Sequence, residues 1–242
     1  MKLMTEHIPA HDRVTELYTF DELDEDIQER LVSRCAERHA NDWDYEYRNT
    51  LEELEKLFGV KCIDWQVDGW SHGYTLFAEY DDYAHFLLAD AAEEDTDEYE
   101  EYGYLALRGN RAMGKCWTLW GKEVTSGHWH YVGKHHRHSR VVFDGLHSGT
   151  CPLTGFCADN DALDPLWDMM EGKHIKDGMT IAEMIDACFE SFFTAWQNDI
   201  RYNTSEEYFR EYEMAEWYDE DGNEVEVPEG ATLTEPKDRA VA

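Results

Sequence analysis

The first regular pattern of hydrophobic positions begins near residue 20. Thr19 and Asp24 are residue types that cap helix N-termini, and Ile27, Leu31 and Cys35 follow at intervals of four residues. Apolar residues at that interval fall on one face of a helix. The pattern therefore predicts an amphipathic helix in this region.

A second helix is predicted directly after the first, over residues 43–58. Gly59 follows the last apolar position and provides a C-terminal stop, because glycine adopts the left-handed conformation that ends many helices. The predicted apolar face consists of Trp43, Tyr47, Leu51, Leu54, Leu57 and Phe58.

The pattern then changes to the alternation typical of strands. In residues 60–67, Ile63, Trp65 and Val67 are placed on one side. Residues 68–73 have turn chemistry, and residues 74–80 form a return strand. Helical spacing returns in residues 81–92, and shorter strand-like pieces follow at 116–120, 128–132 and 140–146.

The last third of the chain returns to helix. Residues 180–203 carry one long apolar stripe, residues 205–218 form a further helix capped by Ser205, and residues 218–225 form a tight turn. The stripe consists of Ile181, Met184, Ile185, Cys188, Phe189, Phe192, Phe193, Trp196 and Ile200.

This order of helices, strands and helices predicts an α+β fold, with helices packed on a mostly antiparallel sheet. The sequence shows no repeat and no linker. We therefore expect a single domain over residues 1–227 and a flexible C-terminal tail over residues 228–242, which has little apolar surface to bury.

The net charge narrows the range of partners. The 242 residues include 54 Asp and Glu against 21 Lys and Arg, a formal net charge of -33. A field of this sign opposes direct binding to nucleic acid or to an anionic membrane, and it favours a basic partner. Hydrophobic residues make up 42% of the chain, which is enough for a packed core despite the charge.

The charges are unevenly distributed along the chain. Residues 81–102 hold ten acids and no base, and residues 205–229 hold eleven acids and one base. Residues 108–147 hold seven bases against two acids, with six of the twelve histidines. Short acidic runs are usually solvated surface. Acidic runs this long, interleaved with tyrosine and tryptophan, instead favour display to a basic groove.

Three stretches carry a resemblance to a known group of proteins: "YTFDELDEDIQERLVSR", the turn "VDGWSHG", and the closing "SEEYFREYEMAEWYDEDGNEV". Together they resemble an uncharacterised family of phage and prophage accessory proteins, over about the first 80 and last 50 residues. The middle of the chain departs from the pattern. The resemblance implies action in a bacterial host cytoplasm and supplies no catalytic residue.

The basic segment contains the candidate metal ligands. His128 and His130 are two residues apart on a predicted strand, and His138, Cys151 and Cys157 follow as further donors. No C-x2-C pair and no H-E-x-x-H motif is present, and neighbouring Lys and Arg would repel a cation. Zinc is therefore an alternative, and the main expectation is no cofactor. The same basic, aromatic segment also offers a surface for self-association, including a homodimer.

The remaining features favour a cytoplasmic, non-enzymatic protein. The N-terminal residues contain no apolar signal segment, and the six cysteines are expected to be free thiols. No phosphate-binding glycine loop or nucleophile motif is present.

The leading hypothesis is a phage-type acidic inhibitor that mimics DNA. It would occupy the basic groove of a nucleic-acid-binding host defence protein, such as a restriction enzyme or a CRISPR effector. The alternatives are a zinc protein or metal-dependent hydrolase using residues 128–157, and a self-associating structural protein. The carboxylates expected to contact the partner are Asp95, Asp97, Glu98, Glu100, Glu101, Glu206, Glu207, Glu211 and Glu213.

Overall fold

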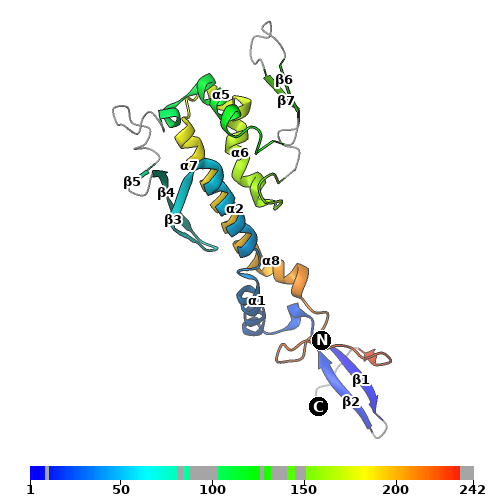
Figure 1. The fold of residues 1–242 in the computed structure, drawn as a ribbon. Coiled ribbons are helices and arrows are strands. Elements are labelled where there is room, and N and C mark those ends of the chain that lie inside the picture. Colours follow the sequence, from blue (N-terminus) through cyan, green and yellow to red (C-terminus); the bar gives the residue numbers. More distant parts are fainter. Residues whose placement is uncertain are drawn as a thin grey trace. The chain divides into compact units, whose positions relative to one another are not determined.

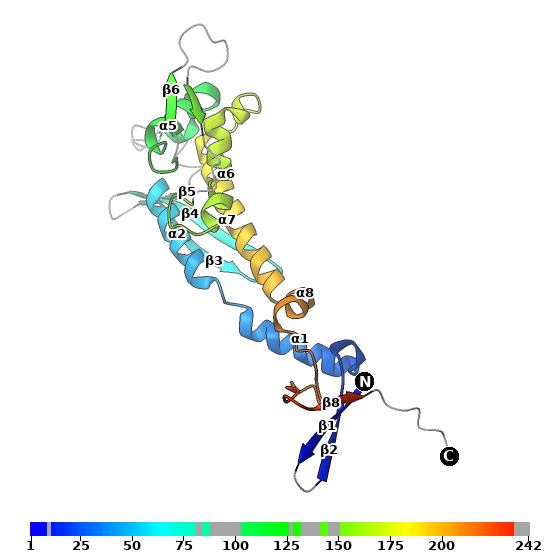
Figure 2. The same ribbon diagram turned by 90° about the vertical axis from the view of Figure 1, so that its right-hand side faces the viewer.

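The computed structural model describes residues 1–8, 11–80, 84–87, 103–125, 128–131, 141–144 and 151–234 (Figures 1 and 2). Its contacts divide the chain into two compact units. The terminal unit comprises Met1–Asp42 and Ile200–Ala242, and the central unit comprises Trp43–Asp199. The α+β class and the antiparallel strand pairing are confirmed, and the strands belong to small sheets of two or three strands. The expectation of a single domain stays a prediction.

The terminal unit combines a small sheet with one long helix. Strands β1 (Lys2–Ile8), β2 (His11–Leu17) and β8 (Thr232–Thr234) pair antiparallel in the order β2-β1-β8. The short helix η1 (Phe20–Glu22) leads into α1 (Glu25–His39). Thus residues 232–234, within the segment expected to be a loose tail, are paired with β1. Neither β1 nor β2 was predicted.

The C-terminal helical segment of this unit is shorter than predicted. Ser205 accepts a hydrogen bond from the backbone N–H of Tyr208, so the expected cap is confirmed. The helix α8 (Glu206–Tyr208) continues as a π-helix, η4 (Phe209–Glu213), and then ends, although the sequence predicted helix to residue 218. The turn predicted at 218–225 is confirmed, because Gly222 N–H donates to the carbonyl of Asp219.

The apolar core of the terminal unit joins α1 to this segment. Phe20 lies against Phe209 with ring centroids 4.9 Å apart, and Tyr218 is 2% exposed. Burial of such aromatic side chains supplies much of the stability of a small unit. The cluster consists of Phe20, Leu23, Leu31, Cys35, Phe209 and Tyr218.

The central unit is built around the long helix α7 (Ile181–Asn203), which the sequence predicted and whose last four residues belong to the terminal unit. Helix α2 (Asp44–Phe58) and the sheet β3-β4-β5 pack against it (Figure 1). Tyr47 of α2 stacks on Trp196 at 5.1 Å, and Tyr74 stacks on Phe193 at 5.0 Å. Both contacts use the predicted apolar stripe, so helix on antiparallel sheet is confirmed here.

The sheet consists of β3 (Val60–Val67), β4 (His72–Tyr80) and β5 (Ala84–Leu87). The prediction that Ile63, Trp65 and Val67 share one side is wrong for Ile63, which is 41% exposed. Asp64 has a φ of 53°, and the β3–β4 register shifts between Ile63 and Gln66. This bulge reverses the alternation, so that Cys62 is buried before it and Trp65 faces α7 after it.

The remaining elements of the central unit are η2 (Gly103–Ala106), α5 (Gly109–Leu119), β6 (His128–Tyr131), β7 (Val141–Asp144), α6 (Ala158–Glu171) and η3 (Lys173–Ile175). The pairing of β6 with β7 confirms the two strands predicted there. The strand predicted at 116–120 is wrong, because this segment lies in and after α5. The helix predicted over 81–92 is wrong at 84–87, which form β5, and its other residues lie outside the described ones. Helix α6 was not predicted.

Candidate functional site

The carboxylates expected to contact a partner divide into two groups. Asp95, Asp97, Glu98, Glu100 and Glu101 lie outside the described residues. Glu206, Glu207, Glu211 and Glu213 lie together on the α8–η4 segment of the terminal unit.

Three of these four side chains already have partners within the unit. Glu206 accepts from Arg210 Nε at 2.7 Å, Glu211 accepts from the Tyr202 hydroxyl at 2.9 Å, and Glu213 accepts from an arginine of α1. Glu207 is exposed, with no ion pair to any residue that the structure describes. Therefore α8–η4 by itself offers a partner less free charge than its sequence suggests.

A groove of about 370 Å³ beside α8 adds further carboxylates from α1. Its lining contains three carboxylates and two apolar side chains, and no basic side chain. The lining residues are Phe20, Glu25, Gln28, Glu29, Val32, Ser33 and Glu206. The sequence did not predict this groove, because only the fold brings η1, one face of α1 and Glu206 together.

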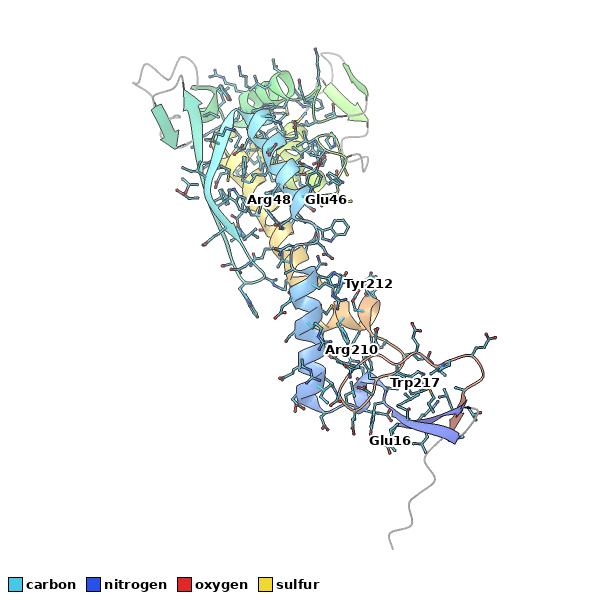
Figure 3. The ribbon with its side chains drawn as sticks, turned by 60° about the horizontal axis from the view of Figure 1, so that its bottom comes forward. Glu16, Glu46, Arg48, Arg210, Tyr212 and Trp217 are labelled. Atoms are coloured by element: carbon cyan, nitrogen blue, oxygen red, sulfur yellow. The ribbon has the colours of Figure 1, made fainter. Side chains whose placement is uncertain are left out.

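Arg210 lies next to this groove and shows how the surface holds a guanidinium (Figure 3). Its Nη2 is 2.8 Å from Asp21, its Nε bonds Glu206, and its Cζ lies 4.6 Å from the centroid of the Phe20 ring. A guanidinium placed over an aromatic face between two carboxylates gains both charge and cation–π attraction. Asp21 and Glu206 hold the pKa of Arg210 above its usual range.

The aromatic residues expected to accompany the acids have different environments. Tyr212 is 60% exposed, whereas Trp217 is buried. Trp217 instead packs with Met4 and Leu17 under the small sheet. Tyr218 is equally inaccessible, and its hydroxyl accepts from the backbone N–H of Ala215. Trp217 and Tyr218 are therefore not exposed for contact with a partner.

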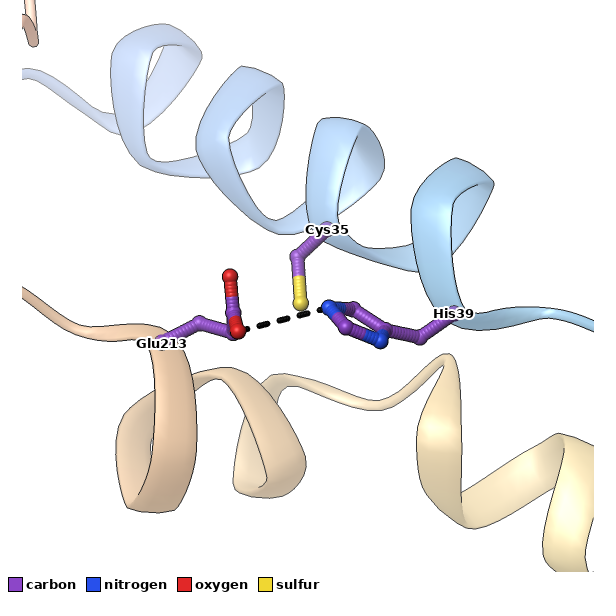
Figure 4. A group of neighbouring side chains, drawn as sticks. All are labelled: Cys35, His39 and Glu213. Carbon is purple, nitrogen blue, oxygen red and sulfur yellow. Dashed lines mark ion pairs between the residues drawn. The ribbon is translucent and has the colours of Figure 1, made fainter. Parts of the chain in front are cut away.

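A second cluster of the terminal unit combines Cys35, His39 and Glu213 (Figure 4). One ligand atom from each lies within 4.8 Å of the other two. The separation between His39 Nε2 and a carboxylate oxygen of Glu213 is 3.4 Å. Of the residues that the structure describes, only these form a group of at least three potential metal ligands within that distance.

Neighbouring charges fix two of these side chains in position. His39 Nδ1 lies 2.5 Å from Asp42, and the second oxygen of Glu213 accepts from Arg38 Nη1 at 2.6 Å. His39 Nε2 is buried and has no hydrogen-bond partner in the described part of the chain. Burial, followed by the charge of Glu213, raises the pKa of the Cys35 thiol. That shift argues against Cys35 as a free nucleophile.

The metal site predicted from the sequence lies in a different part of the chain, residues 128–157. His128 and His130 lie on β6, paired in register with Asp144 and Val142 of β7, and nothing further is described of their side chains. His138 lies outside the described residues. Cys151 is half-buried and accepts from Asn160 at 3.6 Å, and Cys157 is exposed. The grouping of these five residues stays a prediction.

A third feature lies in the central unit, at the start of β4. A pocket of about 580 Å³ is bordered by Trp70, which is 92% exposed, and by His72 and Tyr74. His72 lies 2.9 Å from Gln197 and 3.1 Å from Glu190, so both ring nitrogens have partners. The turn at residues 68–73 was predicted, but its position beside α7 was not.

Comparisons with known proteins do not assign a function to the chain. No family model, no curated protein and no solved structure matches the chain. In the described parts of the chain, no helix has both the length and the apolar character needed to cross a membrane.

Proposed function

We propose that the protein is an acidic inhibitor of phage type, active in a bacterial cytoplasm, that occupies the basic nucleic-acid groove of a host defence protein. The expected partner is a restriction enzyme or a CRISPR effector. The net charge of -33 supports a basic partner, because such a field accelerates encounter with positive surfaces and repels nucleic acid.

The terminal unit carries a large share of this charge. Residues 1–42 and 200–234 together hold 22 acids and 7 bases, a formal net charge of -15. Strands β1, β2 and β8 and the α1 core hold the backbone of this unit in place. A rigid display of charge favours binding, because fewer side chains must be ordered when the partner arrives.

The groove between η1, α1 and α8 is the observation that carries the proposal. Glu25, Glu29 and Glu206 line it together with the half-buried apolar side chain of Val32, and the buried Phe20 forms its base. This combination suits the charged head and the apolar stem of a Lys or Arg side chain. Arg210 is held in the same manner at the edge of the groove, by a carboxylate on either side and the Phe20 ring.

The experiment compares wild-type protein with a double variant of the groove. The tagged full chain is incubated with nuclease-treated bacterial lysate, and retained proteins are eluted by a salt gradient and identified by mass spectrometry. Affinity for the retained protein is then measured with Glu25→Gln/Glu29→Gln. Exposed ion pairs contribute about 0.2–1 kcal/mol each. Loss of two pairs should therefore weaken binding by about 2- to 30-fold.

A matched control removes two charges from the central unit. Glu52 and Glu123 are exposed, and no ion pair of either is described. We expect Glu52→Gln/Glu123→Gln to bind like wild type. Equal affinities for both double variants would contradict a role for the groove. A salt-labile oligomer of the chain alone, with no retained nucleic-acid-binding protein, would instead support self-association.

A further inference from the structure

We propose that Cys35, His39 and Glu213 bind one divalent ion of the zinc class in the terminal unit. None of these three residues lines the acidic groove, although Glu213 is also one of the carboxylates that the sequence predicted to contact the partner. The site also differs in every residue from the metal hypothesis based on residues 128–157.

The ligand types and their spacing suit Zn²⁺. Thiolate, imidazole and carboxylate are its usual protein ligands. Cys35 and His39 are four residues apart on α1, so their side chains lie on the same face of the helix. Glu213 ends the π-helix η4, which packs against α1. Single π-turns of this kind occur frequently at functional sites.

The observed separations agree with a tetrahedral ion. Zinc–nitrogen and zinc–oxygen bonds of about 2.0–2.2 Å at tetrahedral angles place the two ligand atoms about 3.3–3.5 Å apart. The distance from His39 Nε2 to Glu213 is 3.4 Å. Sulfur would lie about 3.5–3.7 Å from either atom. Since the present limit is 4.8 Å, the Cys35 thiol needs to approach by at most about 1.3 Å.

Asp42 and Arg38 orient His39 and Glu213 in the way that residues next to the ligands of a metal site commonly do. Asp42 accepts from His39 Nδ1–H, which leaves the lone pair of the buried Nε2 for a metal. A carboxylate behind a histidine in this way fixes the ring and raises its basicity. Arg38 holds one oxygen of Glu213 and leaves the other facing His39.

The cavity beside the cluster provides room for a fourth ligand. It has a volume of about 210 Å³, and Cys35 and Glu213 are among its lining residues. Three protein ligands with an open fourth position, filled by water, is an arrangement that zinc adopts in proteins. Arg34, Arg38, Asn223 and Glu224 also line the cavity, so its polar lining contains charges of both signs.

The competing explanation is a metal-free ion pair. A protonated His39 would donate to both Asp42 and Glu213, and Cys35 would be a buried core thiol. That arrangement needs no cation and gives no metal-dependent signal, so a direct binding measurement separates the two explanations.

The test is a titration of the reduced, chelator-treated full chain with Co²⁺, a spectroscopic substitute for Zn²⁺. We expect one equivalent of Co²⁺ to produce a thiolate charge-transfer band and tetrahedral d–d bands, and one equivalent of Zn²⁺ to abolish both. Cys35→Ser should remove the charge-transfer band. Asp42→Asn changes an exposed residue outside the core, and it should weaken binding by about 10- to 100-fold without unfolding the protein.

Cys157→Ser is the matched control, because this thiol is exposed and belongs to the alternative site. The charge-transfer band should be unchanged in this variant. The proposal is overturned if no band forms at one equivalent of Co²⁺. It is equally overturned if the band persists in Cys35→Ser, or if it is lost in Cys157→Ser alone.

Discussion

Asp159 provides the sharpest test of the packing in the central unit. It is 0% exposed and lies in the first turn of α6. Its carboxylate accepts from the backbone N–H of Leu153 at 2.9 Å and of Thr154 at 2.7 Å, and from the hydroxyl of Thr50 at 3.0 Å. The side chain thus ties α2 to the loop before α6.

The cost of removing this carboxylate can be worked out from its contacts. Hydrogen bonds to a charged group contribute about 1.5–3 kcal/mol each, and three backbone donors, the N–H groups of Leu153, Thr154 and Gly155, would lose their partner in Asp159→Ala. Some of that loss is offset because a buried charge is also removed. We expect a net destabilisation of about 3–5 kcal/mol for Asp159→Ala. Asp159→Asn keeps an acceptor oxygen, and should cost about 1–2 kcal/mol.

Urea denaturation followed by tryptophan fluorescence measures both variants, with Glu123→Gln as the exposed control. The control should change stability by less than about 0.5 kcal/mol. Hydrogen exchange at Leu153 and Thr154 should accelerate in Asp159→Ala. If Asp159→Ala were as stable as the control, the network would not hold the loop, and the reasoning would be refuted.

Three further predictions concern single residues. Hydrogen bonds from Thr180 lower the pKa of Glu183, so this contact stabilises the fold above the unfolded pKa of about 4.5 and is lost as the pH falls below it. Between pH 7 and pH 3, the melting temperature of Glu183→Gln should therefore fall less than that of wild type. Gly222 has a φ of 80°, and an added Cβ would lie 2.6 Å from Ile27, so Gly222→Ala should destabilise the terminal unit by at least about 1 kcal/mol in urea. Ser205→Ala removes the α8 cap and should cost about 0.5–2 kcal/mol in the same assay, whereas an unchanged midpoint would contradict a role for the cap.

Local signals were sufficient to predict much of the fold. The long stripe of α7, the glycine stop after α2 and the Ser205 cap each depend on residues close together in the chain. The prediction of a strand at 116–120 was wrong because aromatic residues are common in strands. In the structure, the indole N–H groups of Trp117 and Trp120 donate to the backbone carbonyls of Met170 and Leu57. Such tertiary contacts override local propensity.

The candidate sites were less accessible to prediction because they depend on distant residues. Glu206 reaches the groove formed by Glu25 and Glu29 only in the folded terminal unit. Cys35 and His39 are four residues apart on a predicted helix, and this spacing alone could have indicated two metal ligands on one helix face. Their third partner, Glu213, is far along the chain and is positioned by a π-helix, for which the sequence carries no simple mark.

Competition with duplex DNA tests the central claim most directly. The full chain, bound to the protein that it retains from nuclease-treated lysate, is titrated with duplex DNA at fixed salt. If the acidic surface occupies a nucleic-acid groove, duplex DNA should release the partner in proportion to its own affinity, and excess inhibitor should displace the DNA in the reverse titration. Simultaneous binding of DNA and this protein to the partner would contradict the account.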